Sequence, residues 1–241
     1  MIAFKYILTI SITVLASNIF GQYIGYSPIA DSAVSRWKPV DQSEYFGTYR
    51  FGESESESTL ILFQSKAGII AQIKSGAWNS EATDWIWQYD NLNNVTIDKQ
   101  GNFYSDEYKG AFVYYEREGE VIKCLKIVDS WNEVSLKEGA YELGWKMDTA
   151  MDSVYKGAFT FASIRLLLPK ELADFSLKEL KTMRNEIFAR YGYTFNKGGE
   201  MDTYFRDQPW YRPQHSNVNA FLTLLERKNI EEILRMENQK K

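Results

Sequence analysis

The feature that most constrains the fold is a change in the period of the hydrophobic residues at about residue 148. Before it, short runs rich in Ile, Val, Thr, Tyr, Phe and Trp are separated by turn-forming residues, a pattern typical of β-strands. After Pro169, apolar residues recur every three or four positions, as in helices. Short connections between the runs favour antiparallel neighbours, and the fold class is α+β. The predicted parts are an antiparallel β-barrel or sandwich at 40–148, a connector at 149–164 and a mostly helical part at 165–238.

The strand predictions follow the alternation of apolar and polar residues. One further short strand is expected inside the connector, at Lys156–Ser163. The main predicted strands are Tyr45–Phe51, Thr59–Gln64, Gly68–Lys74, Trp85–Tyr89, Asn94–Ile97, Ala111–Glu116, Val121–Val128 and Tyr141–Met147.

Two capping boxes mark the starts of the main helices. Ser176 with Glu179 opens a helix that is expected to end at Gly192. Thr223 with Glu226 opens a last helix, expected to run to about Arg235. A brief helix is predicted around 201–206, before Pro209.

Charged residues in the first of these helices receive different predictions. Arg184 lies within the apolar stripe, so we expect it to be buried and paired with a carboxylate or with carbonyl groups. Glu186 and Arg190 are four residues apart on the other side, and we expect a surface ion pair.

The helical part resembles the YARHG domain over about residues 165–236. The resemblance rests on 177–195, on 204–213 and on 225–230. It implies a small domain of exported bacterial proteins that has no established activity. Phe188 and Tyr191 stand where the family's name motif has Tyr and His, and their aromatic bulk favours a packing role. The motif residues to which the resemblance assigns a structural role are Arg184, Asn185, Glu186, Phe188, Arg190, Tyr191 and Gly192.

The first residues have the pattern of an export signal. Lys5 precedes an apolar run at 6–16, which is shorter than the roughly 20 residues of a membrane span. We therefore predict a signal peptide at 1–21 and a periplasmic or extracellular bacterial protein without a membrane span in its mature form. The alternatives are a buried N-terminal helix and a membrane anchor.

The composition excludes several kinds of functional site. The chain has one cysteine and one histidine, which excludes a disulfide scaffold and a Cys/His zinc site. Cys124 lies in a strand-like run, and we expect it to be buried and inert. We expect His215 to lie at the surface of a polar loop. No phosphate-binding or catalytic motif occurs, so we expect no cofactor, no metal and no enzyme activity. A net charge of −4 argues against a nucleic-acid partner.

Three functional hypotheses remain, and the oligomeric state stays open. Residues 165–241 contain 14 Lys or Arg and 11 Asp or Glu, so this part is mildly basic and favours a cell-wall polymer or an envelope protein as partner. Trp85 and Trp87 share one side of a strand, and they either fill the core or line a cavity or groove; if that side is the inside of a lipocalin-like barrel with a cavity, the protein carries a small apolar or sugar ligand. A hydrolase would need two facing carboxylates. The candidate binding surface comprises Arg190, Lys197, Arg206, Trp210, Tyr211 and Arg212.

Overall fold

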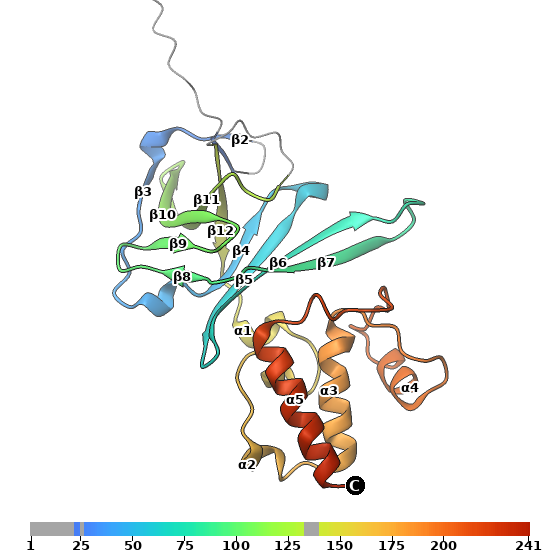
Figure 1. The fold of residues 1–241 in the computed structure, drawn as a ribbon. Coiled ribbons are helices and arrows are strands. Elements are labelled where there is room, and N and C mark those ends of the chain that lie inside the picture. Colours follow the sequence, from blue (N-terminus) through green and yellow to red (C-terminus); the bar gives the residue numbers. More distant parts are fainter. Residues whose placement is uncertain (1–21, 25–26, 133–139) are drawn as a thin grey trace, which may run out of the picture.

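The computed structural model describes residues 22–24, 27–132 and 140–241. The predicted export signal at 1–21 lies outside the described residues. A curled sheet forms the upper part of the molecule and a group of helices forms the lower part (Figure 1). Within the described residues, no helix combines the length and the apolar character that crossing a membrane requires.

The strands are β1 (Gln22–Ile24), β2 (Ser27–Pro28), β3 (Val34–Arg36), β4 (Gly47–Phe51), β5 (Ser58–Ser65), β6 (Gly68–Trp78), β7 (Trp85–Asn91), β8 (Thr96–Ile97), β9 (Asn102–Tyr104), β10 (Lys109–Arg117), β11 (Glu120–Val128) and β12 (Tyr141–Met147). The α-helices are α1 (Met151–Val154), α2 (Pro169–Leu172), α3 (Leu177–Arg190), α4 (Glu200–Arg206) and α5 (Leu224–Gln239). Short 3₁₀ turns are η1 (Asp31–Ala33), η2 (Gln42–Tyr45), η3 (Ser54–Ser56) and η4 (Thr160–Ser163).

All the described strands belong to one sheet, whose main path runs β7-β6-β5-β4-β12-β11-β10-β9-β8. Every neighbouring pair on this path is antiparallel, and only β1 adds a parallel pairing, to β12. The predicted antiparallel β part followed by helices is confirmed. The sheet curls into a half-barrel. Strands β1, β2, β3 and β9, each of two or three residues, were not predicted.

The inside of the curl is filled by side chains. Strands that are far apart in the sheet order, β6 and β9, contribute Ile73 and Phe103 to one buried cluster with Tyr49, Phe51 and Phe112. A cluster that joins distant strands lies on the concave face. Aromatic packing therefore occupies the inside of the half-barrel.

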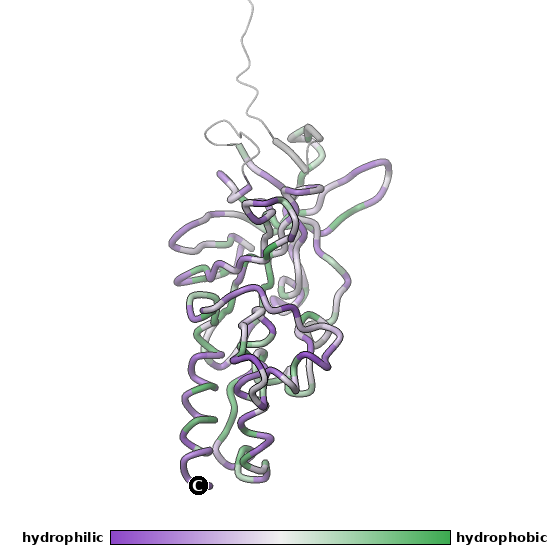
Figure 2. The backbone as a smooth tube through the Cα atoms, turned by 90° about the vertical axis from the view of Figure 1, so that its right-hand side faces the viewer, coloured by the Kyte–Doolittle hydropathy of each residue, from purple (hydrophilic) through white to green (hydrophobic). Residues whose placement is uncertain are grey.

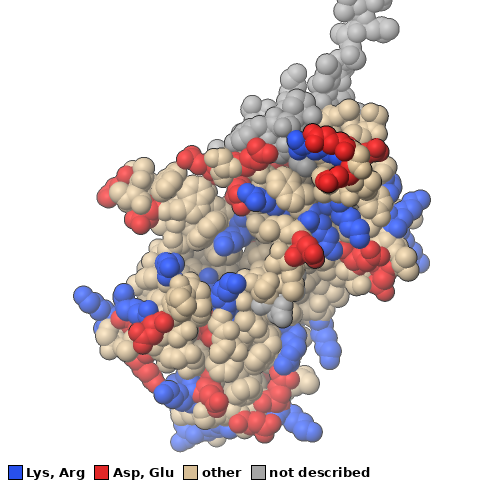
Figure 3. Space-filling view, turned by 180° about the vertical axis from the view of Figure 1, so that it is seen from behind, with Lys and Arg blue, Asp and Glu red and all other residues tan. Residues whose placement is uncertain are grey.

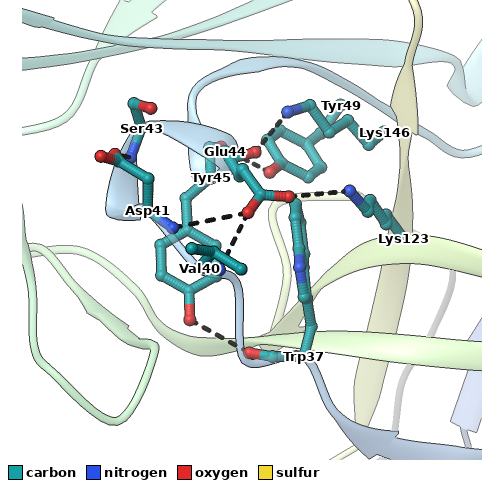
Figure 4. Close-up of polar contacts among 9 residues, drawn as sticks. All are labelled: Trp37, Val40, Asp41, Ser43, Glu44, Tyr45, Tyr49, Lys123 and Lys146. Carbon is teal, nitrogen blue, oxygen red and sulfur yellow. Dashed lines mark hydrogen bonds and ion pairs between the residues drawn. The ribbon is translucent and has the colours of Figure 1, made fainter.

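The turn η2 and the segment before it add Tyr45 and Trp37 to this buried cluster (Figure 4). The Tyr45 hydroxyl donates to the Trp37 carbonyl at 3.0 Å, and the Tyr49 hydroxyl donates to the Tyr45 carbonyl at 2.5 Å. At the rim, the Lys123 ammonium donates to the Glu44 carboxylate at 3.1 Å. The buried phenols thus find backbone partners, and the charged groups stay at the edge.

Cys124 lies on the other face of the sheet. It is buried, as predicted, and burial raises the pKa of its thiol to about 12. Its neighbours Ile29, Val113 and Leu143 form an apolar cluster in which the N-terminal segment covers this end of the outer face. A thiol in such surroundings is held in its unreactive, neutral form.

The two long helices pack side by side along their apolar faces, and hydrophobic and hydrophilic stretches alternate along them in Figure 2. Leu180, Met183 and Ile187 of α3 meet Ile233 and Met236 of α5. Both predicted capping boxes are present, at Ser176 and at Thr223. Helix α5 continues to Gln239, beyond the predicted end.

Arg184 was predicted to pair with a carboxylate or with carbonyl groups, and in the structure its partner is a carboxylate on α5. The Arg184 Nε donates to Glu237 Oε1 at 2.7 Å, and this bond ties the two long helices together. The Glu237 side chain is 2% exposed, whereas that of Arg184 is 24% exposed. The predicted pairing is therefore confirmed, but the arginine is partly rather than fully buried.

The prediction of a surface pair between Glu186 and Arg190 is wrong. Their side chains are 1% and 5% exposed, because the connector folds over this side of α3. The Glu186 carboxylate accepts from the Ala158 and Phe159 amides at 2.9 and 2.7 Å, and the Arg190 Nε donates to the Lys156 carbonyl at 2.7 Å.

The same contacts explain why the strand predicted at Lys156–Ser163 does not form. The Ala158 and Phe159 amides, which would donate hydrogen bonds to a neighbouring strand, donate to the Glu186 carboxylate. The segment then ends in the turn η4. Gly157 has a φ of +115°, and a Cβ there would stand 2.2 Å from the Glu186 carboxyl carbon. Only glycine combines this backbone conformation with so close an approach.

Removing the carboxylate of this buried pair should be costly. We expect Glu186→Ala to lower the free energy of unfolding by about 3–5 kcal/mol, because it leaves a buried guanidinium without its counter-charge. Urea denaturation at pH 7 measures the change.

The matched control is Glu232→Ala, which breaks an ion pair with Arg235 whose side chains are 24% and 47% exposed. We expect that loss to be at most about 1 kcal/mol. Equal effects of the two substitutions would contradict the structural role of the Glu186 carboxylate.

Candidate functional site

The helical part docks on the outer face of the sheet. Ile61, Phe63 and Ile70 of β5 and β6 pack against Tyr155 of the connector and Leu225 of α5. All five side chains are buried. Burial of this apolar surface holds the two parts together and places residues of the helical part beside the sheet.

Two amide side chains of the sheet extend this contact with hydrogen bonds. Gln72 and Asn91 are paired across β6 and β7, and both donate to the Phe221 carbonyl, at 2.7 and 3.1 Å. The Tyr191 hydroxyl, at the end of α3, lies 3.2 Å from Gln72 Oε1 and donates to Glu226 Oε2 at 2.7 Å. The polar groups of this interface are therefore linked from the sheet to both long helices.

A loop of the helical part covers β7, which is an edge of the sheet. The Gln214 amide nitrogen donates to the Trp85 carbonyl at 2.7 Å, and its oxygen accepts from the Trp87 amide at 3.2 Å. The His215 Nε2 lies 2.9 Å from the Trp87 carbonyl. His215 is partly buried in this contact rather than lying in a free surface loop. The bonds satisfy backbone groups that an edge strand would otherwise expose.

Beside these contacts lies a cleft of about 330 Å³ between the sheet and the helical part, which we call the interdomain cleft. Its lining includes four Lys or Arg side chains and, among the described residues, no Asp or Glu. Figure 3 shows the molecule from behind, with Lys and Arg around the hollow between its upper and lower parts. The cationic lining residues are Lys74, Lys156, Arg190 and Arg212, and the aromatic ones are Trp87, Tyr89, Tyr155, Tyr191 and Trp210.

The structure divides the predicted binding surface of the helical part. Arg190, Trp210 and Arg212 line the cleft. Tyr211 is buried and donates to the Tyr193 carbonyl at 2.7 Å, so its place in a binding surface is corrected to a place in the core. The other two predicted residues, Lys197 and Arg206, are exposed and do not line the cleft.

Arg190 lines the cleft, but its guanidinium forms hydrogen bonds with other groups of the protein. Besides Glu186 and the Lys156 carbonyl, it donates to the Ser163 hydroxyl at 2.7 Å. Its role as a ligand-binding residue is therefore corrected to a structural one. Lys74, Lys156 and Arg212 form no ion pair within the described part of the chain, although the Arg212 Nη1 donates to the Pro209 and Tyr211 carbonyls at 3.0 and 2.8 Å.

Trp85 and Trp87 do share one side of β7, but this is the outer face. Trp87 pairs with Gly76 and stands two positions from Tyr89, which pairs with Lys74. The inside of the half-barrel is filled by its own core, and neither tryptophan belongs to that cluster. The location inside a barrel is therefore corrected. Trp87 lines the interdomain cleft instead.

Of the remaining motif residues, only Gly192 lines the cleft. Asn185 donates to the Lys181 carbonyl at 2.7 Å, and Phe188 packs against the helical core. Gly192 has a φ of +74°, and a Cβ there would stand 2.7 Å from the Arg212 carbonyl. The glycine thus lets the chain that carries Arg212 approach the end of α3.

Two buried hydroxyls in the cleft wall lack a partner. Thr48 Oγ1 and Tyr155 Oη make no hydrogen bond to any described residue, although the two side chains are only 3% and 7% exposed. Buried polar atoms are normally hydrogen-bonded. Lys74 adds an ammonium 4.0 Å from the centre of the Trp87 ring, and burial lowers its pKa. The cleft therefore offers positive charge, hydroxyl groups and ring faces together.

Sequence reasoning missed Lys74, Thr48, Tyr155 and Lys156. They stand on strands and on the connector, and only the docking of the helical part brings them together. The described residues contain no group of three or more His, Cys, Asp or Glu that could hold a metal ion.

Comparison with known proteins supports the family resemblance. Residues 158–238 match the family model of the YARHG domain. The match begins earlier than the predicted 165, and it includes Ala158 and Phe159, whose amides hold the Glu186 carboxylate. No curated protein and no solved structure matches the chain.

The glutamates of the two capping boxes, Glu226 and Glu179, allow the effect of burial on a carboxylate pKa to be tested. Burial raises the pKa of Glu226, whereas hydrogen bonds from Ser176 lower the pKa of exposed Glu179. Glu226 thus favours folding most below the pKa of an unfolded glutamate, about 4.3, and this contribution is lost as the pH rises through its folded pKa. Glu179 contributes above the unfolded pKa and loses its effect as the pH falls.

We therefore expect Glu226→Gln to gain stability relative to the wild type between pH 4 and pH 7, by no more than about 1.4 kcal/mol per pH unit for one group. Glu179→Gln should lose relative stability over the same range. Urea denaturation at pH 4, 5.5 and 7 gives both trends. Parallel trends for the two variants would show that burial does not govern Glu226.

Proposed function

We propose that the protein is a non-catalytic binding protein of the bacterial cell envelope, and that its interdomain cleft holds an anionic part of an envelope polymer. The observation that supports this proposal is the lining of the cleft: cationic and aromatic side chains from both parts of the molecule, with no acidic residue among those described. An exported chain, as its first residues predict, would meet such polymers.

The charge of the cleft differs from that of the whole chain, which is −4. Association with an anion depends on the local electrostatic potential rather than on the net charge. A cleft with low-dielectric walls focuses the electric field of its charged groups. The aromatic rings suit a ligand in which the anion is attached to a ring, as in an acidic sugar. Lys156 and Arg212 are exposed at the cleft and can reach such a group.

A pull-down of residues 22–241 on insoluble cell-wall sacculi, which carry carboxylates, tests this function. We expect binding that weakens between low and physiological salt, because it depends on charge. Lys156→Ala/Arg212→Ala should weaken it at least about tenfold, since a hydrogen bond to a charged group contributes about 1.5–3 kcal/mol.

Lys197→Ala/Arg206→Ala is the charge-matched control, because it also removes two positive charges but away from the cleft. It should retain most of the binding. Equal losses in the two double variants, or no binding by the wild type, would contradict the proposal.

A further inference from the structure

The interdomain cleft does not end at Trp87. A second hollow of about 270 Å³ adjoins it and shares Thr59, Lys74 and Trp87 with it. The second hollow adds Trp85 and the loop before β5 to the lining. The two hollows therefore adjoin each other on the outer face of β6 and β7, and we call them together the groove.

The groove follows a hairpin that projects from the sheet. Pairing of β5 with β6 stops at Thr59 and Lys74, whereas β6 and β7 continue to pair as far as Trp78 and Trp85. In Figure 1 the β6–β7 arm extends beyond the neighbouring strands. An open arm of this kind offers a long surface instead of a closed pocket.

Two tryptophans stand in succession along the groove. The centres of the Trp85 and Trp87 rings are 6.1 Å apart and their planes cross at 81°, so the rings meet edge to face, and Trp87 is 37% exposed. Opposite them, Gly76 carries no side chain, and a Cβ there would meet the Trp85 ring at 2.1 Å. The glycine leaves the space that the Trp85 ring occupies on this face of the hairpin.

Charge is distributed unequally along the groove. Lys156 and Arg212 line only the interdomain cleft, and Lys74 lies at the junction. The second hollow adds no further cation, and its one carboxylate, Glu57, is paired with Arg50. A ligand that matches this pattern has an anion at one end and uncharged rings at the other.

We infer that the groove binds an extended glycan chain, with an acidic sugar in the interdomain cleft and the next, uncharged sugar on Trp85 and Trp87. This inference rests on the proposed function and deepens it, because it makes the ligand a polymer segment of at least two sugars. Stacking on tryptophan suits sugar rings, and the cations select the acidic one.

Oligosaccharides that alternate glucuronate and N-acetylglucosamine test this inference. Isothermal titration calorimetry compares glucuronate with oligosaccharides of two, four and six sugars, and with uncharged chito-oligosaccharides. We expect the tetrasaccharide to bind at least about tenfold more tightly than glucuronate, an increase that corresponds to about 1.4 kcal/mol. The chito-oligosaccharides should bind far more weakly.

Trp85→Ala should remove this gain while leaving the affinity for glucuronate within about twofold, and Trp85→Phe, which keeps a ring, should retain part of it. Tyr104→Ala is the control, because Tyr104 is an exposed aromatic residue of β9 that lines neither hollow. It should bind like the wild type.

The outcomes separate the two proposals. A tetrasaccharide that binds no better than glucuronate, or equal losses in Trp85→Ala and Tyr104→Ala, would overturn the extended groove and leave the cleft as an anion site. Failure of every acidic probe together with the sacculi would overturn the proposed function and the groove with it.

Discussion

The structure depends on the need to bury both faces of β5. Leu60 and Leu62 point into the core of the half-barrel, and Ile61 and Phe63 point the opposite way. A strand that is apolar on both faces is stable only between two layers. The helical part supplies the second layer through Tyr155 and Leu225, so docking is a structural requirement of the sheet. The interdomain cleft is a consequence of that docking.

The residues that carry the YARHG resemblance serve this architecture in the present chain. Glu186 and Arg190 hold the connector against α3, and Tyr191 joins α3 to α5 and to the sheet. Gly192 lets the loop with Arg212 approach. Arg190, Tyr191 and Gly192 therefore form part of the wall of the cleft, together with Trp210 and Arg212 from the second segment of the resemblance.

Much of the fold could be predicted from local patterns, whereas most of the site could not. Alternation and capping boxes depend on neighbours in sequence, so they located β4 to β8, β10 to β12 and both long helices. Alternation also showed that Trp85 and Trp87 share a side, but it cannot tell which side faces the core. The burial of Arg190 depends on the connector 34 residues earlier, and the cleft depends on two parts meeting. Such long-range contacts leave no periodic signal.

The most direct test of this account is whether the two parts unfold together. Six of the seven tryptophans lie in the β part, so fluorescence reports on the sheet, and circular dichroism at 222 nm reports mainly on the helices. A urea titration followed by both signals should show one transition with the same midpoint, as expected for a single cooperative unit. Two separated midpoints would show that the sheet does not need the helical layer, and would contradict the account.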